Sequence, residues 1–235
     1  MKTKKRKFFA HGMGAAMAMA ALVLALCAVR PAAAQAAEAS GLRAQWAEIK
    51  YREPDRKAQI EKFDELAQKA EALSKAEPQN AAVKVWAGTA LSSEAAAIDG
   101  ITALPKLKRA KALLEAAIAQ DDKAEGGFAH AVLGALYDRV PGWPIAFGDG
   151  DKARAHLKRG LEIDPAGIDA NFYYGDYLVH QKKYAEAVPV LEKALAAKDR
   201  PGMKTADEGR RAEIRSALQK ARAGAQKAPE KSGYN

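Results

Sequence analysis

Residues 151–201 read DKARAHLKRGLEIDPAGIDANFYYGDYLVHQKKYAEAVPVLEKALAAKDRP, and one helical pattern is written in them twice. Small and apolar residues return after 34 positions, so that Ala153, Leu157, Gly160 and Leu161 recur as Ala187, Leu191, Ala194 and Leu195. A fixed period of this length at helical spacing is typical of a solenoid of helix-turn-helix units. The pattern therefore predicts stacked helical hairpins that share one core and leave a surface free for binding.

The rest of the chain also has the pattern of helices, because apolar residues recur at three- and four-residue spacing and no alternating strand pattern is found. The predicted helices cover about 39–52, 55–76, 80–98, 105–120 and 128–139, with a connector at 101–105. Asp55 is expected to cap the second helix by accepting a hydrogen bond from a free backbone amide. Gly88, Gly134 and Gly175 are expected to let neighbouring helices approach closely.

A last helix is predicted to close the array. Thr205 and Glu208 have the spacing of a capping box, in which each side chain satisfies a free amide. The helix that follows combines an apolar stripe with many basic residues, as a solenoid end requires. Arg210 and Arg211 either hold a carboxylate or phosphate or form a polar outer face. Residues 224–235 are predicted to be a disordered tail.

The first 34 residues have the pattern of a secretory signal peptide. Basic residues at 2–7 precede an apolar run at 12–29, and Ala32-Ala33-Ala34 is the expected cleavage site. Cys27, the only cysteine, would leave with this segment, so no disulfide is expected. The predicted mature protein is periplasmic, does not span a membrane and has its repeat domain at 35–223. The alternative is that the apolar run stays as an uncleaved anchor.

The net charge of +9 is concentrated at the two ends of the chain. The first 34 residues contain six basic and no acidic side chains, whereas the body at 35–199 is close to neutral. A nucleic-acid-binding fold would present a basic patch on its body. Nucleic acid is therefore not an expected partner.

Several motifs resemble tetratricopeptide repeats (TPR). The resemblance is carried by Leu133-Gly134-x-x-Tyr137, Ala153 with Leu157 and Gly160, Pro165, and Tyr184-Ala185-Glu186-Ala187. It is good over 128–201 and weaker over 39–122. It implies an all-α, TPR-like right-handed solenoid of helical hairpins, here with an inserted loop and a C-terminal capping helix. It also implies that the first helices of successive hairpins line a concave groove.

A second resemblance is looser. The blocks 140–149, 167–175 and 207–214 are similar to a group of exported bacterial proteins and, more distantly, to the periplasmic T component of tripartite (TRAP) transporters. This similarity implies ligand handling beside a solute-binding protein. No defined ligand motif can be matched, so no residue role follows from it.

The segment 140–150 is the place where the chain departs from its period. Pro141 and Pro144 fix their own backbone torsions, and Trp143 and Phe147 supply apolar surface on a loop. One interpretation is a rigid aromatic rim over the groove that contacts a ligand or peptide. The other is a plug that fills a gap between helices.

The first helix of the last repeat supplies the other candidate binding residues. Spacing of four places Phe172, Asp176 and His180 on one face, with Tyr173 beside them. The resemblance turns this face toward the groove, together with residues of the preceding first helix, namely Phe128, Asp138 and Arg139. This wall suits a polar ligand with an apolar part, or it only carries contacts to a partner protein.

Motifs for catalysis or metal binding are not found in the sequence. It contains no nucleophile elbow, phosphate-binding glycine loop or zinc motif. His130, His156 and His180 have no ligand-like spacing, and Asp149-Gly150-Asp151 lacks the further ligands of a calcium loop, which favours helix capping. No cofactor or metal is therefore expected.

These observations predict a non-catalytic periplasmic scaffold that mediates protein-protein interaction. The alternative is an accessory component of a transport system, which would hold a small amphiphilic ligand between the insert and the Phe172 face. An enzyme is a third possibility, supported only by scattered carboxylates.

Overall fold

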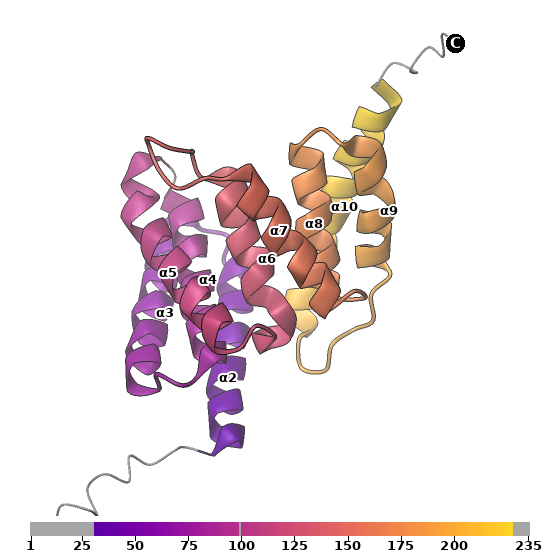
Figure 1. The fold of residues 1–235 in the computed structure, drawn as a ribbon. Helices are drawn as coiled ribbons and strands as arrows, with labels where there is room; N and C mark the ends of the chain where they lie inside the picture. The colour runs from indigo at the N-terminus through magenta and orange to yellow at the C-terminus, as the bar shows by residue number, and fades with distance from the viewer. Residues whose placement is uncertain (1–30, 99, 228–235) are drawn as a thin grey trace, which may run out of the picture.

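The computed structural model describes residues 31–98 and 100–227, and in these ranges the chain forms helices joined mostly by short turns (Figure 1). The helices are α2 (Ala32–Arg52), α3 (Arg56–Ala76), α4 (Ala81–Ile98), η1 (Ile101–Ala103), α5 (Leu104–Gln120), α6 (Ala124–Arg139), α7 (Gly150–Ile163), α8 (Ile168–His180), α9 (Tyr184–Leu195) and α10 (Lys204–Lys227). Within the same ranges, the one β-type pairing is an isolated bridge between Gly142 and Gly148. The predicted all-α, TPR-like helical solenoid is confirmed.

α2 begins at Ala32, earlier than the predicted start near residue 39. The added residues are mostly alanine, which has the highest helix propensity of all residues. The predicted cleavage site therefore coincides with the first turn of α2. The signal segment before residue 31, with Cys27, lies outside the described residues. In 31–98 and 100–227, no helix has the length and apolar character needed to cross a bilayer.

Three hairpins repeat one close contact, in which a glycine of the first helix faces a leucine of the second. A Cβ atom on any of these glycines would lie 2.6 or 2.7 Å from the facing leucine side chain. The pairs are Gly88 and Leu114 in α4–α5, Gly134 and Leu157 in α6–α7, and Gly175 and Leu191 in α8–α9. The expected close approach of helices at these glycines is confirmed.

The first predicted hairpin is arranged differently. Asp55 caps α3 as expected, accepting a hydrogen bond from the Ala58 backbone N–H at 2.7 Å. However, α3 packs more extensively on α4 than on α2, and α2 instead contacts both α4 and α10. Leu42 and Trp46 of α2 are buried, and the Trp46 indole N–H donates to the Ser93 hydroxyl at 2.8 Å. α2 therefore covers the inner side of the array.

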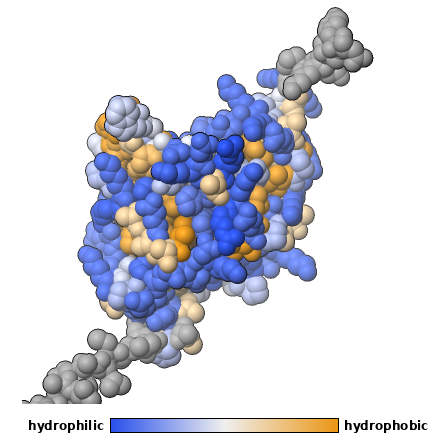
Figure 2. All heavy atoms as spheres, in the orientation of Figure 1, coloured by the Kyte–Doolittle hydropathy of each residue, from blue (hydrophilic) through white to orange (hydrophobic). Residues whose placement is uncertain are grey.

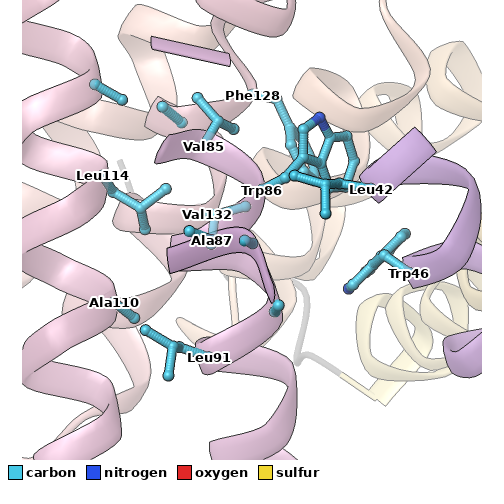
Figure 3. Close-up of a cluster of buried hydrophobic side chains, with 14 of the residues drawn as sticks. Leu42, Trp46, Val85, Trp86, Ala87, Leu91, Ala110, Leu114, Phe128 and Val132 are labelled. Carbon is cyan, nitrogen blue, oxygen red and sulfur yellow. The ribbon is translucent and has the colours of Figure 1, made fainter. Parts of the chain in front are cut away.

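A row of aromatic rings runs through the core from α2 to α8. Its members, in order, are Tyr51, Trp46, Trp86, Phe128, Tyr173 and Phe172, with neighbouring ring centroids 5.3 to 6.0 Å apart. Figure 3 shows the middle of this row, where Leu42 and Trp46 of α2 lie beside Trp86 and Phe128. A second apolar cluster joins α8, α9 and α10. Both clusters are built at the predicted helical spacing.

The ends of two helices differ from the prediction. α10 begins at Lys204, so Thr205 lies inside its first turn and the predicted capping box does not form. The carboxylate of Asp207 instead accepts a hydrogen bond from the Arg200 backbone N–H at 2.8 Å. α10 also continues past Gly224, whose absent side chain leaves room for the Tyr184 ring. Residues 228–235 of the predicted disordered tail lie outside the described residues.

Candidate binding site

A cavity of about 670 Å³ lies on the inner side of the array, between α2, α4, α6, α8 and α10. The wall supplied by η1, α5, the end of α6 and the insert is apolar, and it includes Ile101, Leu104, Leu107, Leu136, Val140 and Ile145. The polar groups that line the cavity come mostly from α2, α8 and α10, and they form what is called the polar wall: Lys50, Arg139, Tyr173, Asp176, Arg210 and Glu213. Both the volume and the mixture of many apolar with a few polar groups are typical of sites for compact ligands.

Arg210 forms the centre of the polar wall, although only 3% of its surface is exposed. Its guanidinium donates to Asp169 and to Glu213, each at 2.6 Å, and lies 4.5 Å from the centroid of the Phe172 ring. Burial alone would lower the pKa of Arg210, but Tyr173, Asp169 and other acidic neighbours outweigh it and raise the pKa. Arg210 is therefore a fixed positive charge, which differs from its expected place on a polar outer face.

The last helix and the first described helix close the site by contacting each other. The Tyr51 hydroxyl of α2 donates to Glu213 of α10 at 3.0 Å, and Lys50 lies 3.5 Å from the same carboxylate. Arg52 pairs with Glu208 at 2.9 Å. α10 can approach because it presents Gly209, where a Cβ atom would lie 2.2 Å from the Tyr51 ring. Burial raises the pKa of Tyr51, so its hydroxyl keeps its proton and remains a donor. The array thus forms a closed ring.

The structure brings the predicted α6 and α8 residues together but divides them into three groups. Arg139, Phe172, Tyr173 and Asp176 line the cavity, and Arg139 is ion-paired with Asp176. Asp138 and His180 bond to each other at 2.8 Å away from the cavity lining. Phe128 is buried beneath Tyr173, with their ring centroids 6.0 Å apart.

The two aromatic residues of the insert lie in different surroundings, and neither forms a rim over the cavity. Phe147 is partly buried and meets the Tyr137 ring edge-on at a centroid distance of 5.8 Å, so it packs as a plug. Trp143 is 90% exposed and does not line the cavity. Asp149 caps α7 by accepting hydrogen bonds from the backbone N–H groups of Asp151 and Lys152, both at 3.1 Å. The insert is therefore anchored at its base and exposed at its tip.

A second polar cluster lies between α6 and α7, outside the cavity. The Nδ1 atoms of His130 and His156 are 2.9 Å apart, and His130 Nε2 lies 2.8 Å from the Asp122 carboxylate. Hydrogen bonds from Arg159 and His130 lower the pKa of Asp122 to about 2. Burial and the neighbouring His130 lower the pKa of His156. The facing Nδ1 atoms can share one proton, but two would place N–H groups against each other. In the described ranges, no group of three metal-ligating side chains is found.

Sequence reasoning missed three residues that α2 and α10 add to the cavity, namely Trp46, Lys50 and Glu213. It considered Arg210 as a group that holds an anion, but could not place it in this cavity. Neither helix belongs to a repeated pair, so the period contains no information on where they pack. One signal was present in the sequence, namely Gly209, the position in α10 against which the Tyr51 ring packs.

Comparison with known proteins supports the repeat character of the C-terminal half. The family model described as tetratricopeptide repeat matches residues 145–206, which include α7, α8 and α9. The search of curated proteins finds no match. Tetratricopeptide repeats suggest a scaffold for protein-protein interaction, and the family is typically non-catalytic.

Proposed function

We propose that the protein is a non-catalytic scaffold of the periplasm that binds a partner protein at the cavity. The observation that carries this proposal is the cavity on the inner side of a helical array in which residues 145–206 match the tetratricopeptide repeat model. The signal-like pattern of the first 34 residues supports the location. Cell fractionation tests it, since recovery of the protein in the cytoplasm would exclude a periplasmic function.

The position of α2 restricts the shape of the partner element. α2 packs on α4 and α10 and so covers part of the inner side. An extended peptide that ran along the whole groove would have to displace the buried residues Leu42 and Trp46. The bound element is therefore compact, such as a chain end or a short turn with one apolar side chain and one polar group.

A non-catalytic role is supported by the pairing of the polar groups in the cavity. Asp176 is held by Arg139, and Glu213 is held by Lys50, Arg210 and Tyr51. A general base needs a lone pair that faces its substrate, whereas the oxygens of these carboxylates are engaged by neighbouring cations and by the Tyr51 hydroxyl. Their role is to fix the shape and charge of the wall.

The second candidate function is the binding of a small amphiphilic ligand, as an accessory to a transport system. The observation that favours it is the unequal character of the two walls of one cavity. The apolar wall from Ile101 to Ile145 suits an alkyl or ring body, and the wall around Arg210 suits a hydrogen-bonding head group. Such a ligand would lie with its head toward α10 and its body toward the insert.

One pair of variants tests both candidates. Ala96 is exposed on α4 and lines the cavity, so Ala96→Trp should fill the cavity without disturbing the core. Ala119→Trp places the same side chain on an exposed position of α5 outside the cavity and is the matched control. Native mass spectrometry of the protein from its own source gives the bound species. A protein partner lost only in Ala96→Trp supports the scaffold, and a small molecule lost only there supports the second candidate. If Ala96→Trp still carries the partner protein or the small molecule, the cavity is not the binding site of that species.

A further inference from the structure

The exposed apolar side chains of the molecule gather at one end. Among the described residues, the large apolar side chains that remain exposed are Trp143 at 90%, Ile101 at 72% and Ile145 at 60%. They belong to two connectors, the insert and η1, that lie at the upper left of Figure 1. Figure 2 shows pale and orange surface projecting there from a front that is mostly hydrophilic. Contiguous exposed apolar surface of this kind marks a contact with a partner or a membrane.

The tip of the insert is held in place by its own backbone. The Gly148 N–H donates to the Pro141 carbonyl at 2.9 Å, and the Ile145 N–H donates to the Gly142 carbonyl at 3.1 Å. Below the tip, the Asp149 N–H donates to the Tyr137 carbonyl at 2.9 Å. The exposure of Trp143 is therefore a property of an ordered turn. A preformed projection binds without the entropy loss of ordering a loop.

Cationic residues surround this end of the molecule. Lys108 in the second turn of α5 and Lys182 and Lys183 in the α8–α9 turn are all exposed. The α8–α9 turn and the C-terminal end of α10 lie at the same upper end as the insert (Figure 1). Of the acidic groups near these segments, Asp149 caps α7 and Asp151 pairs with Arg154 at 2.8 Å, whereas Glu186 in the first turn of α9 is exposed. Three exposed lysines thus stand against one exposed glutamate in the segments at this end, which gives it an excess of positive charge.

We propose that this end of the protein docks on an anionic lipid surface, with Trp143, Ile145 and Ile101 entering the interfacial layer. Indole rings favour the boundary between head groups and acyl chains. Lysines near such a surface are attracted by its negative potential. A pocket on a partner protein would bind one anchoring side chain. Here the exposed apolar side chains come from two separate connectors, the insert and η1, on a projecting end, which favours a lipid surface. Lipid docking does not depend on either proposed function.

The docking face also meets the mouth of the cavity, because Ile101 and Ile145 belong to both. If the second candidate function holds, an amphiphile could pass between a bilayer and the cavity without its apolar part crossing water. This consequence depends on that function, whereas the docking itself does not. Vesicles that contain only phospholipid therefore test the docking alone.

The sequence provides its own probe for this test. It has three tryptophans, and Trp46 and Trp86 are each only 4% exposed, so a solvent-dependent emission change reports on Trp143. The predicted mature chain, from residue 35 onward, is used, because the apolar run at 12–29 would itself enter lipid. Vesicles of phosphatidylcholine with phosphatidylglycerol should shift the emission to shorter wavelength, and brominated acyl chains should quench it.

Variants separate the apolar from the charged contribution. In vesicle co-sedimentation, Trp143→Ala should lower the partition coefficient about tenfold, which corresponds to the burial of a large side chain. The double variant Lys182→Glu with Lys183→Glu should weaken binding to anionic vesicles and leave binding to pure phosphatidylcholine unchanged. Ala119→Trp, on an exposed face of α5, should behave as the parent. The proposal is overturned if vesicles leave the tryptophan emission unchanged or if Trp143→Ala sediments with vesicles like the parent. It is also overturned if the emission shifts only when a partner protein is added.

Discussion

The hairpins α6–α7 and α8–α9 have the same packing and very different connectors. In each, a glycine of the first helix meets a leucine of the second, and a Cβ atom there would lie 2.6 Å from the leucine. The α8–α9 turn has three residues, 181–183, whereas α6 and α7 are joined by the insert at 140–149. The geometry of a hairpin is therefore set by the facing surfaces of its helices. The connector is free to carry another function.

The largest expected effect tests whether the two hairpins are equally packed. Leu157→Ala and Leu191→Ala each remove a side chain that is at most 1% exposed. Each should lower the free energy of unfolding by about 2 to 5 kcal/mol through lost burial and the cavity left behind. Urea denaturation followed by circular dichroism measures both. A loss below about 1 kcal/mol in one variant only would show that the hairpins are not equivalent.

The glycine side of the same contact gives a smaller effect. Gly134→Leu and Gly175→Leu should each destabilise the protein by about 1 to 3 kcal/mol, since the added atoms overlap the facing leucine. Gly160→Ala is the matched control, because its Cβ atom would lie 3.8 Å from the nearest neighbours. The control should retain or slightly raise stability, as alanine favours helix. Unchanged melting temperatures in both leucine variants would contradict the observed helix contacts.

A third prediction distinguishes the hairpins by pH, because only α6–α7 contains the pair of His130 and His156. The folded state lowers the pKa of His156, mainly through burial. This group therefore contributes stability above its unfolded pKa of about 6.5, and the contribution is lost as the pH falls through that region. His156→Gln keeps a hydrogen-bonding side chain but removes the titration.

The measurement is the free energy of unfolding at several pH values between 8 and 5. On acidification, the free energy of unfolding of the parent should fall more steeply than that of His156→Gln. Near pH 8 the difference between the two proteins should not depend on pH. Equal slopes would show that the histidine pair does not titrate in this range.

The smallest expected effect concerns the insert. Trp143→Ala should change stability by no more than about 0.5 kcal/mol, because the side chain is 90% exposed. Phe147→Ala should cost more than this, since its ring packs against Tyr137. Differential scanning calorimetry compares the two variants. A marked loss with Trp143→Ala would show that the tip contributes to the fold, which would weaken the division of the insert into an anchor and a tip.

The 34-residue period of the sequence predicted those parts of the fold that repeat. Leu157 and Leu191 were placed in equivalent positions from spacing alone, and the structure buries both. The position of α2 could not be predicted this way, because the bond between Tyr51 and Glu213 joins residues 162 positions apart and has no repeated counterpart. The predicted start of α10 was wrong, because the spacing of Thr205 and Glu208 is only a local signal. The carboxylate of Asp207 satisfies a distant backbone N–H instead.

The candidate site shows the same division. Spacing of four correctly placed Phe172 and Asp176 on one face, and Arg139, which the resemblance turned toward the same groove, is ion-paired with Asp176. Spacing could not show that Arg210 would be buried against Phe172, since that contact depends on the ring closing through α10. The sequence spacing of His130 and His156 predicts no contact between them. The packing of α6 on α7 brings their side chains together.

The closure of α2 onto α10 also fixes an order of events during synthesis. Among the described helices, α10 is synthesised last, and it supplies Arg210 and Glu213 to the wall of the cavity. A nascent chain that lacks this helix can stack its earlier hairpins but has no complete chamber. A chain that stops before α10 therefore lacks the polar groups of this wall, and any binding that depends on them requires α10.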